Sequence, residues 1–187
     1  GYKIFVAEVG STCNESLLIH YLLKNTDNKA EKAYLINHFL EQFKGTLYRQ
    51  TMFAEFEKIT HKMVEEGETL TSDILCKVYY DLNKQYFGED MVLDEEIALE
   101  WARIPHFYNP FYVYQYATGI SAAIALSKKI MEQGEAGVKD YMKFLTGGGS
   151  KDPIDLLKLA GVDMTTKEPI EKALELFKEL LDQMEQS

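Results

Sequence analysis

A short aromatic segment holds the side chains best suited to chemistry. His106 is followed by Tyr108, Tyr112 and Tyr116, which recur every four residues. A helix beginning at about Asn109 would place these tyrosines along one face, with Tyr108 at its edge. A buried phenol needs a hydrogen-bond partner, which Leu, Ile or Val in the same position would not need. The row of hydroxyls beside a histidine therefore predicts a surface that donates hydrogen bonds to a ligand. The alternative is an aromatic stripe in the core whose hydroxyls reach the surface.

Two glutamates near the start of the sequence form a second candidate. Glu8 lies inside an apolar run, Phe5–Val9, and Glu15 follows seven residues later on the same helical face. Ser11 and Thr12 add hydroxyls between them. A carboxylate in apolar surroundings is costly unless it is paired, hydrogen-bonded or bound to a metal. Glu8 is thus either a ligand or a solvated residue at a helix edge.

The histidines do not supply a metal site by themselves. His20, His38, His61 and His106 form no H-x-x-x-H, no H-E-x-x-H and no Glu-x-x-His repeat. We expect His20 and His38 to be packing residues and His61 to be exposed. The chain as given cannot complete a zinc site.

Two other polar motifs have simpler interpretations. Glu55 and Glu57 are separated by one residue, so they lie on different faces of a helix and are not expected to work as an acid–base pair. The run at positions 147–151, Gly-Gly-Gly-Ser-Lys, lacks the order of a phosphate-binding loop. We interpret it as a flexible linker that could touch a ligand.

Helical periodicity and few prolines predict an all-α fold without strands. No internal repeat and no domain boundary are visible, so we expect a single helical lobe over residues 1–187. The expected helices are residues 5–22, 28–67 with an interruption at 45, 74–87, 93–103, 109–133, 134–145, 153–160 and 168–184.

Composition limits the function. The 187 residues carry a net charge of −10, which argues against nucleic acid or an anionic membrane as a partner. No apolar run reaches the length of a membrane span. The two cysteines are expected to be buried free thiols in a reducing compartment, the cytoplasm. The sequence begins with Gly rather than Met, and we expect it to be a piece of something longer.

Several segments together resemble oligoendopeptidase F, a zinc oligopeptidase related to thimet oligopeptidase. They are residues 5–15 (FVAEVGSTCNE), 46–57 (TLYRQTMFAEFE), 104–119 (IPHFYNPFYVYQYATG), 148–153 (GGSKDP) and 159–163 (LAGVD). The likeness covers essentially all of the chain. It implies an irregular multi-helix lobe, the C-terminal part of a zincin-like oligopeptidase.

The resemblance also implies roles for individual residues. In the family, an H-E-x-x-H helix supplies two histidine ligands and the catalytic glutamate, and a glutamate matching Glu8 supplies the third zinc ligand. Glu15 would stand outside the ligand set and orient a ligand histidine. His106 and a nearby tyrosine would stabilise the oxyanion. Tyr112 is the first choice, with Tyr108 and Tyr116 next.

The implied function is zinc-dependent hydrolysis of short, unstructured peptides by the parent protein. Because the H-E-x-x-H segment is absent here, this chain alone is expected to be inactive and to hold no zinc, or only an adventitious ion. Its implied partner is the missing N-terminal part of the same protein, and apolar residues exposed at the truncated edge, such as Phe5 and Val9, would favour self-association. The alternative function is a non-catalytic α-helical module that binds peptides or serves as a scaffold.

Overall fold

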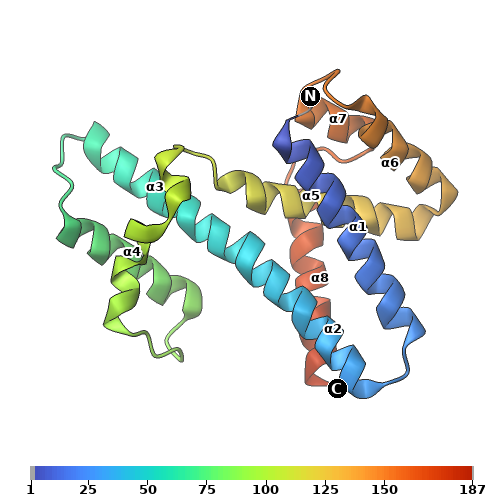
Figure 1. Ribbon diagram of the computed structural model, residues 1–187, viewed down its shortest axis with the longest axis horizontal. Helices are drawn as coiled ribbons and strands as arrows, with labels where there is room; N and C mark the ends of the chain where they lie inside the picture. Colours follow the sequence, from blue (N-terminus) through green and yellow to red (C-terminus); the bar gives the residue numbers. More distant parts are fainter. Residues whose placement is uncertain (1–2, 187) are drawn as a thin grey trace. The chain divides into compact units, whose positions relative to one another are not determined.

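The chain is helical, as the sequence predicts. A computed structural model describes residues 3–186, and these residues contain no strand (Figure 1). Their contacts divide into two compact units. Unit 1 comprises the segments up to Leu47 and from Tyr116 onward, and unit 2 comprises Tyr48–Gln115. Each unit is described by itself below, and the expectation of a single lobe stays a prediction.

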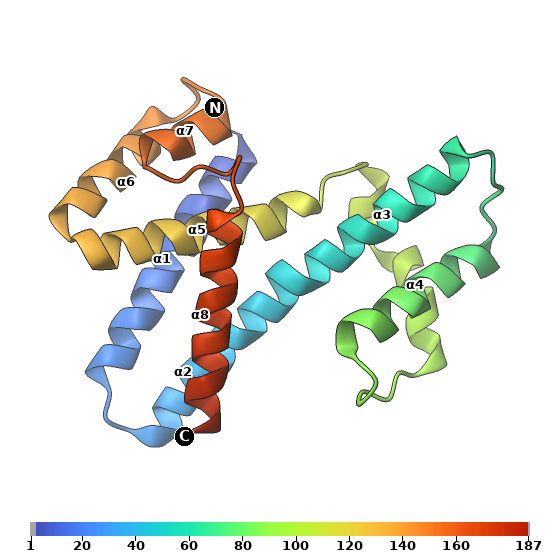
Figure 2. The same ribbon diagram turned by 180° about the vertical axis from the view of Figure 1, so that it is seen from behind.

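Unit 1 is built from helices at both ends of the sequence. In it α1 packs on α2, α2 on α8, and α6 on α7. Both views show α2 and α8 running side by side, although they are far apart in the sequence (Figures 1 and 2). Its elements are α1 (Ile4–Asn25), α2 (Lys29–Gln42), most of the π-helix η1 (Phe43–Tyr48), most of α5 (Tyr114–Gln133), α6 (Glu135–Gly147), α7 (Pro153–Leu159) and α8 (Glu168–Glu185).

Small residues let α1 and α5 approach closely in the core of unit 1. A Cβ added to Gly119 of α5 would lie 3.6 Å from Phe5 Cε2 and 3.8 Å from Val9 Cγ2. Farther along the same two helices, the buried Ser16 and Ser127 hydroxyl oxygens are 2.9 Å apart and share a hydrogen bond. The run from Ala117 to Ser127 is nearly all buried, because alanines and glycine fill little space between the helices.

Capping residues set several helix ends. Asn28 accepts hydrogen bonds from the backbone N–H groups of Ala30 (2.9 Å) and Glu31 (3.3 Å), and so caps α2. The Thr71 hydroxyl caps α4 by accepting from the N–H of Ile74 at 3.3 Å. Gly88 ends α4 with φ of 80°, a conformation that glycine adopts readily.

The long helix predicted over residues 28–67 is present with one irregularity. α2, η1 and α3 (Arg49–Glu65) follow one another without a break, and the π-helical stretch contains Gly45. The interruption predicted there is therefore a change of helix type rather than a gap. Along residues 3–186, no helix combines enough length with enough apolar character to cross a membrane.

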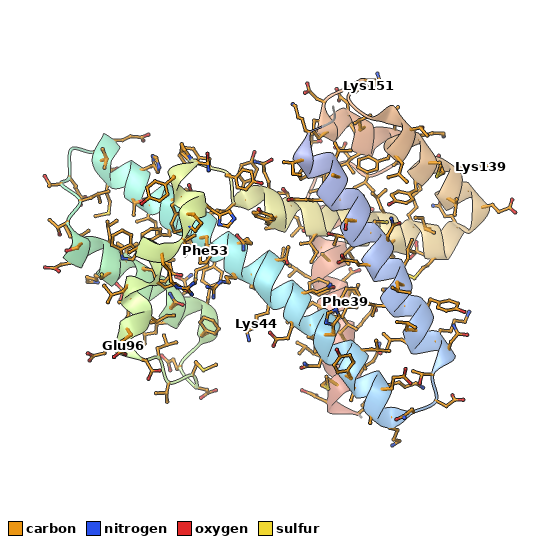
Figure 3. All side chains as sticks on the ribbon, in the orientation of Figure 1. Phe39, Lys44, Phe53, Glu96, Lys139 and Lys151 are labelled. Atoms are coloured by element: carbon orange, nitrogen blue, oxygen red, sulfur yellow. The ribbon has the colours of Figure 1, made fainter. Side chains whose placement is uncertain are left out.

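Unit 2 packs aromatic rings between α3, α4 (Ser72–Phe87) and two short 3₁₀ helices, η2 (Glu95–Arg103) and η3 (Pro105–Tyr108). Phe53 of α3, labelled in Figure 3, lies with its ring centroid 5.6 Å from that of Phe107. The ring centroid of Phe56 lies 5.3 Å from that of Tyr79 and 5.3 Å from that of Phe107. The segment predicted as an α-helix at 93–103 is thus a 3₁₀ helix that closes this aromatic core.

Candidate functional site

The α1 helix positions both candidate glutamates. Its buried face is apolar, so the glutamates flank that face instead of entering it. Glu8 is half-buried and Glu15 is exposed. The buried face consists of Phe5, Val6, Val9, Gly10, Cys13, Ser16 and Ile19.

The two carboxylates differ in environment. Burial raises the pKa of Glu8 above its ordinary value, so its charged form is disfavoured. Glu15 instead accepts a hydrogen bond from Gln42 Nε2 at 3.3 Å, which ties α1 to α2. Glu8 is therefore the carboxylate that would gain more from a bound cation.

Unit 1 also places Tyr116 near the turn of α1 that carries Glu8. Gly119, one helical turn after Tyr116, lies against Phe5 and Val9, and these two residues bracket Glu8 in the sequence. The Tyr116 side chain is half-buried. The segment of α5 that begins at Tyr116 thus packs on the same part of α1 as the candidate ligand.

Unit 2 contains the other members of the predicted aromatic site. The rings of His106 and Tyr112 are stacked, with centroids 6.1 Å apart and planes inclined by 14°. Tyr112 is half-buried, whereas Tyr108 is 85% exposed. The structure therefore brings His106 together with Tyr112, the tyrosine that the family resemblance placed first.

The predicted helix through this segment is wrong over its first part. α5 begins at Tyr114 rather than at Asn109, so Tyr108 and Tyr112 do not share a helical face with Tyr116. Pro110 and the left-handed Phe111 (φ 58°) stand in between. A helix requires negative φ at every residue, which excludes Phe111 from one.

A turn takes the place of that helix. The N–H of Asn109 donates to the carbonyl of His106 at 3.0 Å, and the N–H of Tyr112 donates to the carbonyl of Asn109 at 3.2 Å. These two hydrogen bonds, each spanning three residues, turn the chain, so that His106 and Tyr112 can stack although they are six positions apart.

Sequence reasoning missed Glu57. Its side chain is buried, and its Oε1 accepts a 2.9 Å hydrogen bond from the backbone N–H of Phe111. One turn later on α3, the exposed His61 lies with its ring centroid 4.6 Å from that of Phe111. The available signal was a glutamate between Phe53 and Ile59, on a helix whose neighbours are mostly apolar or aromatic.

Metal binding needs more ligands than this part of the chain brings together. Among residues 3–186, no group of three or more His, Cys, Asp or Glu side chains could hold a metal ion. Glu8 fits the role of a single ligand, because it is a partly desolvated carboxylate and zinc accepts carboxylate oxygen. Cys13 and Cys76 are free; Cys13 is buried and Cys76 is half-buried.

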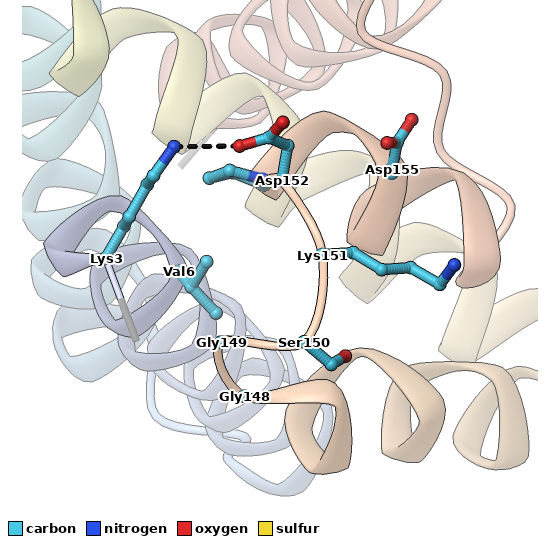
Figure 4. Close-up of a pocket in the computed structure, with 9 residues that line it drawn as sticks. Lys3, Val6, Gly148, Gly149, Ser150, Lys151, Asp152 and Asp155 are labelled. Atoms are coloured by element: carbon cyan, nitrogen blue, oxygen red, sulfur yellow. Dashed lines mark hydrogen bonds and ion pairs between the residues drawn. The ribbon is translucent and has the colours of Figure 1, made fainter. Parts of the chain in front are cut away.

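The glycine-rich linker borders an open pocket in unit 1 of about 480 Å³ (Figure 4). Gly148, Gly149 and Ser150 line one side of the pocket. Lys3 and Asp152 also line it, and they form an ion pair at 2.9 Å. Both charged side chains are mostly exposed, and Lys151 extends away from that pair. An exposed ion pair of this kind contributes little stability.

Comparisons with known proteins find relatives that match nearly the whole of this chain. Oligopeptidase PepF of Bacillus subtilis (strain 168) is 59% identical over 185 residues, covering 99% of this chain and 28% of that protein. The chromosomal oligoendopeptidase F of Lactococcus lactis subsp. cremoris is 43% identical over 184 residues, covering 98% of this chain and 31% of that protein. The chain therefore spans less than a third of the length of these relatives.

Solved structures carry the same fold. The crystal structure of oligoendopeptidase-F from Enterococcus faecium matches with a TM-score of 0.94 at 46% identity, over 99% of this chain and 36% of that one. A putative peptidase from Chlamydophila abortus matches with a TM-score of 0.90 at 42% identity, over 98% of this chain and 31% of that one. The model of peptidase family M3 matches residues 1–176, and the chain belongs to that family.

Proposed function

We propose that the chain is part of a longer zinc-dependent endopeptidase that hydrolyses short oligopeptides. The observation that carries the proposal is the family match across residues 1–176, in which Glu8, His106 and Tyr112 all lie. The stacked pair of His106 and Tyr112 supports it, because two hydrogen-bonding side chains held together on one turn suit the recognition of a carbonyl oxygen.

Glu8 would hold the metal through its carboxylate, and Glu15 would orient a neighbouring ligand. When bound, zinc would supply Lewis-acid activation of water and of the peptide carbonyl. The H-E-x-x-H segment, with its two histidine ligands and general base, would come from a part of the parent outside this chain.

Tyr112 and His106 would act on the substrate directly. As charge develops on the carbonyl oxygen, the Tyr112 hydroxyl and a ring N–H of His106 would donate hydrogen bonds to it. Removing one such donor typically costs about 2.7–4 kcal/mol of transition-state stabilisation. Tyr116 and Tyr108 are the next candidates. The strong exposure of Tyr108 makes it better suited to contacting a bound peptide than to a desolvated donor role.

The proposed substrates are short, unstructured peptides, and the proposed location is the cytoplasm. The two free cysteines support a reducing compartment.

The test uses the full-length parent and a short peptide that carries a fluorophore and a quencher. We expect cleavage that a chelator abolishes and that added zinc restores. A parent that binds such peptides without cutting them, with zinc present, would instead favour the peptide-binding or scaffold module.

A further inference from the structure

Glu57 lies where a carboxylate is costly. It is on α3 and only 4% exposed, between the aromatic core of unit 2 and the turn that follows η3. Burial raises its pKa, and the Phe111 N–H and the nearby His61 offset only part of that effect. Among residues 3–186, its Oε2 has no hydrogen-bond partner. A buried carboxylate with one of its oxygens unsatisfied needs a reason beyond packing.

That reason is the bond to Phe111. The Phe111 N–H donates to Glu57 Oε1 at 2.9 Å across 54 residues of sequence. Phe111 is the only non-glycine residue with positive φ along the described chain, residues 3–186. Such a conformation is costly for a side chain with a Cβ and persists only when its surroundings impose it. Phe111 is 52% exposed, so burial of this residue does not compensate for the cost of its conformation.

Two residues on a single face of α3 contact Phe111. Glu57 binds its backbone, and His61, four residues later on the same face, contacts its ring at 4.6 Å. Immediately after Phe111, Tyr112 stacks on His106 and Val113 is fully buried. The left-handed residue is thus the point at which the chain turns Tyr112 back onto His106.

We propose that Glu57 is a positioning residue, which anchors Phe111 through its backbone N–H and thereby fixes the stacked pair of His106 and Tyr112 for hydrogen bonding to the oxyanion. This inference rests on the proposed function, since it assigns Glu57 to the geometry of the same oxyanion donors. The anchor requires a side chain of the right length rather than a charge, because one acceptor oxygen has to meet one N–H.

The experiment separates reach from charge in the full-length parent. Glu57→Gln keeps an acceptor oxygen at the same distance and removes the charge. Glu57→Asp keeps the charge and withdraws the acceptor by about 1.5 Å, one carbon–carbon bond. We expect Glu57→Gln to retain kcat within about threefold, and Glu57→Asp to lose kcat by about 100-fold, since a displacement of about 1 Å can cost that much. KM should change far less in both.

Glu55→Gln and Glu55→Asp are the matched controls. Glu55 lies on the same helix and also accepts a hydrogen bond, but from Tyr86 Oη of α4 at 2.9 Å, not from the turn. Both Glu55 variants should keep kcat. All variants are assayed well below their thermal midpoints, with zinc content measured, so that loss of folded or metal-loaded protein is not counted as loss of turnover.

The outcomes are distinct. A Glu57→Asp enzyme that is less stable but has unchanged kcat would reduce Glu57 to a structural residue. A Glu57→Gln enzyme that loses kcat while Glu57→Asp keeps it would show that the charge matters instead of the anchor. If Glu57→Asp does not fold, Glu57→Met, which keeps the length of the side chain and removes the acceptor oxygen, replaces it with the same expected loss of kcat. A wild-type parent without zinc-dependent cleavage would overturn the proposed function itself, whereas an active wild type with unaffected Glu57 variants would overturn only this inference.

Discussion

At α1, the half-buried Glu8 carboxylate is held where water cannot fully solvate it, and a bound cation would compensate for that loss. We therefore expect Glu8→Gln in the parent to lose most of its zinc, because an amide oxygen is a much poorer zinc ligand than a carboxylate. Glu15→Gln is the comparison: an orienting residue typically contributes about 10–100-fold in metal affinity. Metal analysis after dialysis at fixed free zinc gives both values. A Glu8→Gln protein with full zinc content would contradict the ligand assignment.

Glu100 forms the charged centre of unit 2. It is 7% exposed and accepts hydrogen bonds from Tyr79 Oη at 2.6 Å, from Arg49 Nη2 at 2.5 Å and from Arg103. Burial alone would raise its pKa, but these bonds outweigh burial and hold the pKa below its ordinary value. Its ionised form therefore stabilises the folded state at neutral pH.

The sign of that pKa shift sets a pH dependence. A carboxylate with a lowered pKa contributes stability above its unfolded pKa, near 4.5, and loses it as the pH falls through the folded pKa. Glu100→Gln should cost on the order of 3 kcal/mol at pH 7, and the difference from wild type should shrink as the pH falls below about 4.5. Denaturant unfolding at several pH values measures this. Glu96→Gln, at an exposed site on the same 3₁₀ helix, should show no such trend, and a constant Glu100→Gln deficit down to pH 2 would be inconsistent with the assignment.

At the scale of elements, the contact between α5 and α6 depends on a glycine. A Cβ at Gly137 would lie 2.8 Å from Ile130 Cα and 2.8 Å from Lys129 O, both backbone atoms that cannot move aside. Gly137→Ala should therefore destabilise the protein by about 1–3 kcal/mol, despite the better helix propensity of alanine. In Gly45→Ala the new Cβ would meet no described atom within 4 Å, so a stabilisation of about 0.5–1 kcal/mol is expected. Thermal unfolding compares the two, and equal effects would disprove the close approach.

The element ends that the sequence predicted correctly are those with local causes. Asn28 and Thr71 cap helices through their own side chains, and Gly88 ends one through its own backbone, so the signal lies within a few residues. The predicted start of α5 was wrong for the opposite reason. The left-handed Phe111 is held by Glu57, 54 positions earlier, and no local pattern reveals a backbone anchor that distant.

The same distinction explains how far the site was predictable. Glu8 was a candidate because an acidic residue interrupts an apolar run on its own helix, and in the structure it is half-buried. A helix from about Asn109 was expected to place Tyr108, Tyr112 and Tyr116 on one face beside His106; α5 begins only at Tyr114, and a turn stacks His106 on Tyr112 instead. The role of the buried Glu57 was not predicted, because its spacing from Glu55 argued against shared acid–base work. Its actual partner is a backbone N–H.

For the whole molecule, length is the governing fact, because the chain matches less than a third of its curated relatives. Residues 3–186 bring together no three-ligand metal site, and all 187 residues lack H-E-x-x-H. Residues 1–187 produced alone should therefore bind less than one zinc per chain and leave a quenched peptide uncut, at concentrations where the parent cleaves it rapidly. Phe5 and Val9 are buried, so the expectation that they are exposed was wrong. The exposed apolar side chains of α1 include Leu18 and Tyr21 instead, and these should cause association, visible by sedimentation. Chelator-sensitive turnover by the isolated chain would mean that its own residues complete the metal site, and the division of ligands proposed here would have to be abandoned.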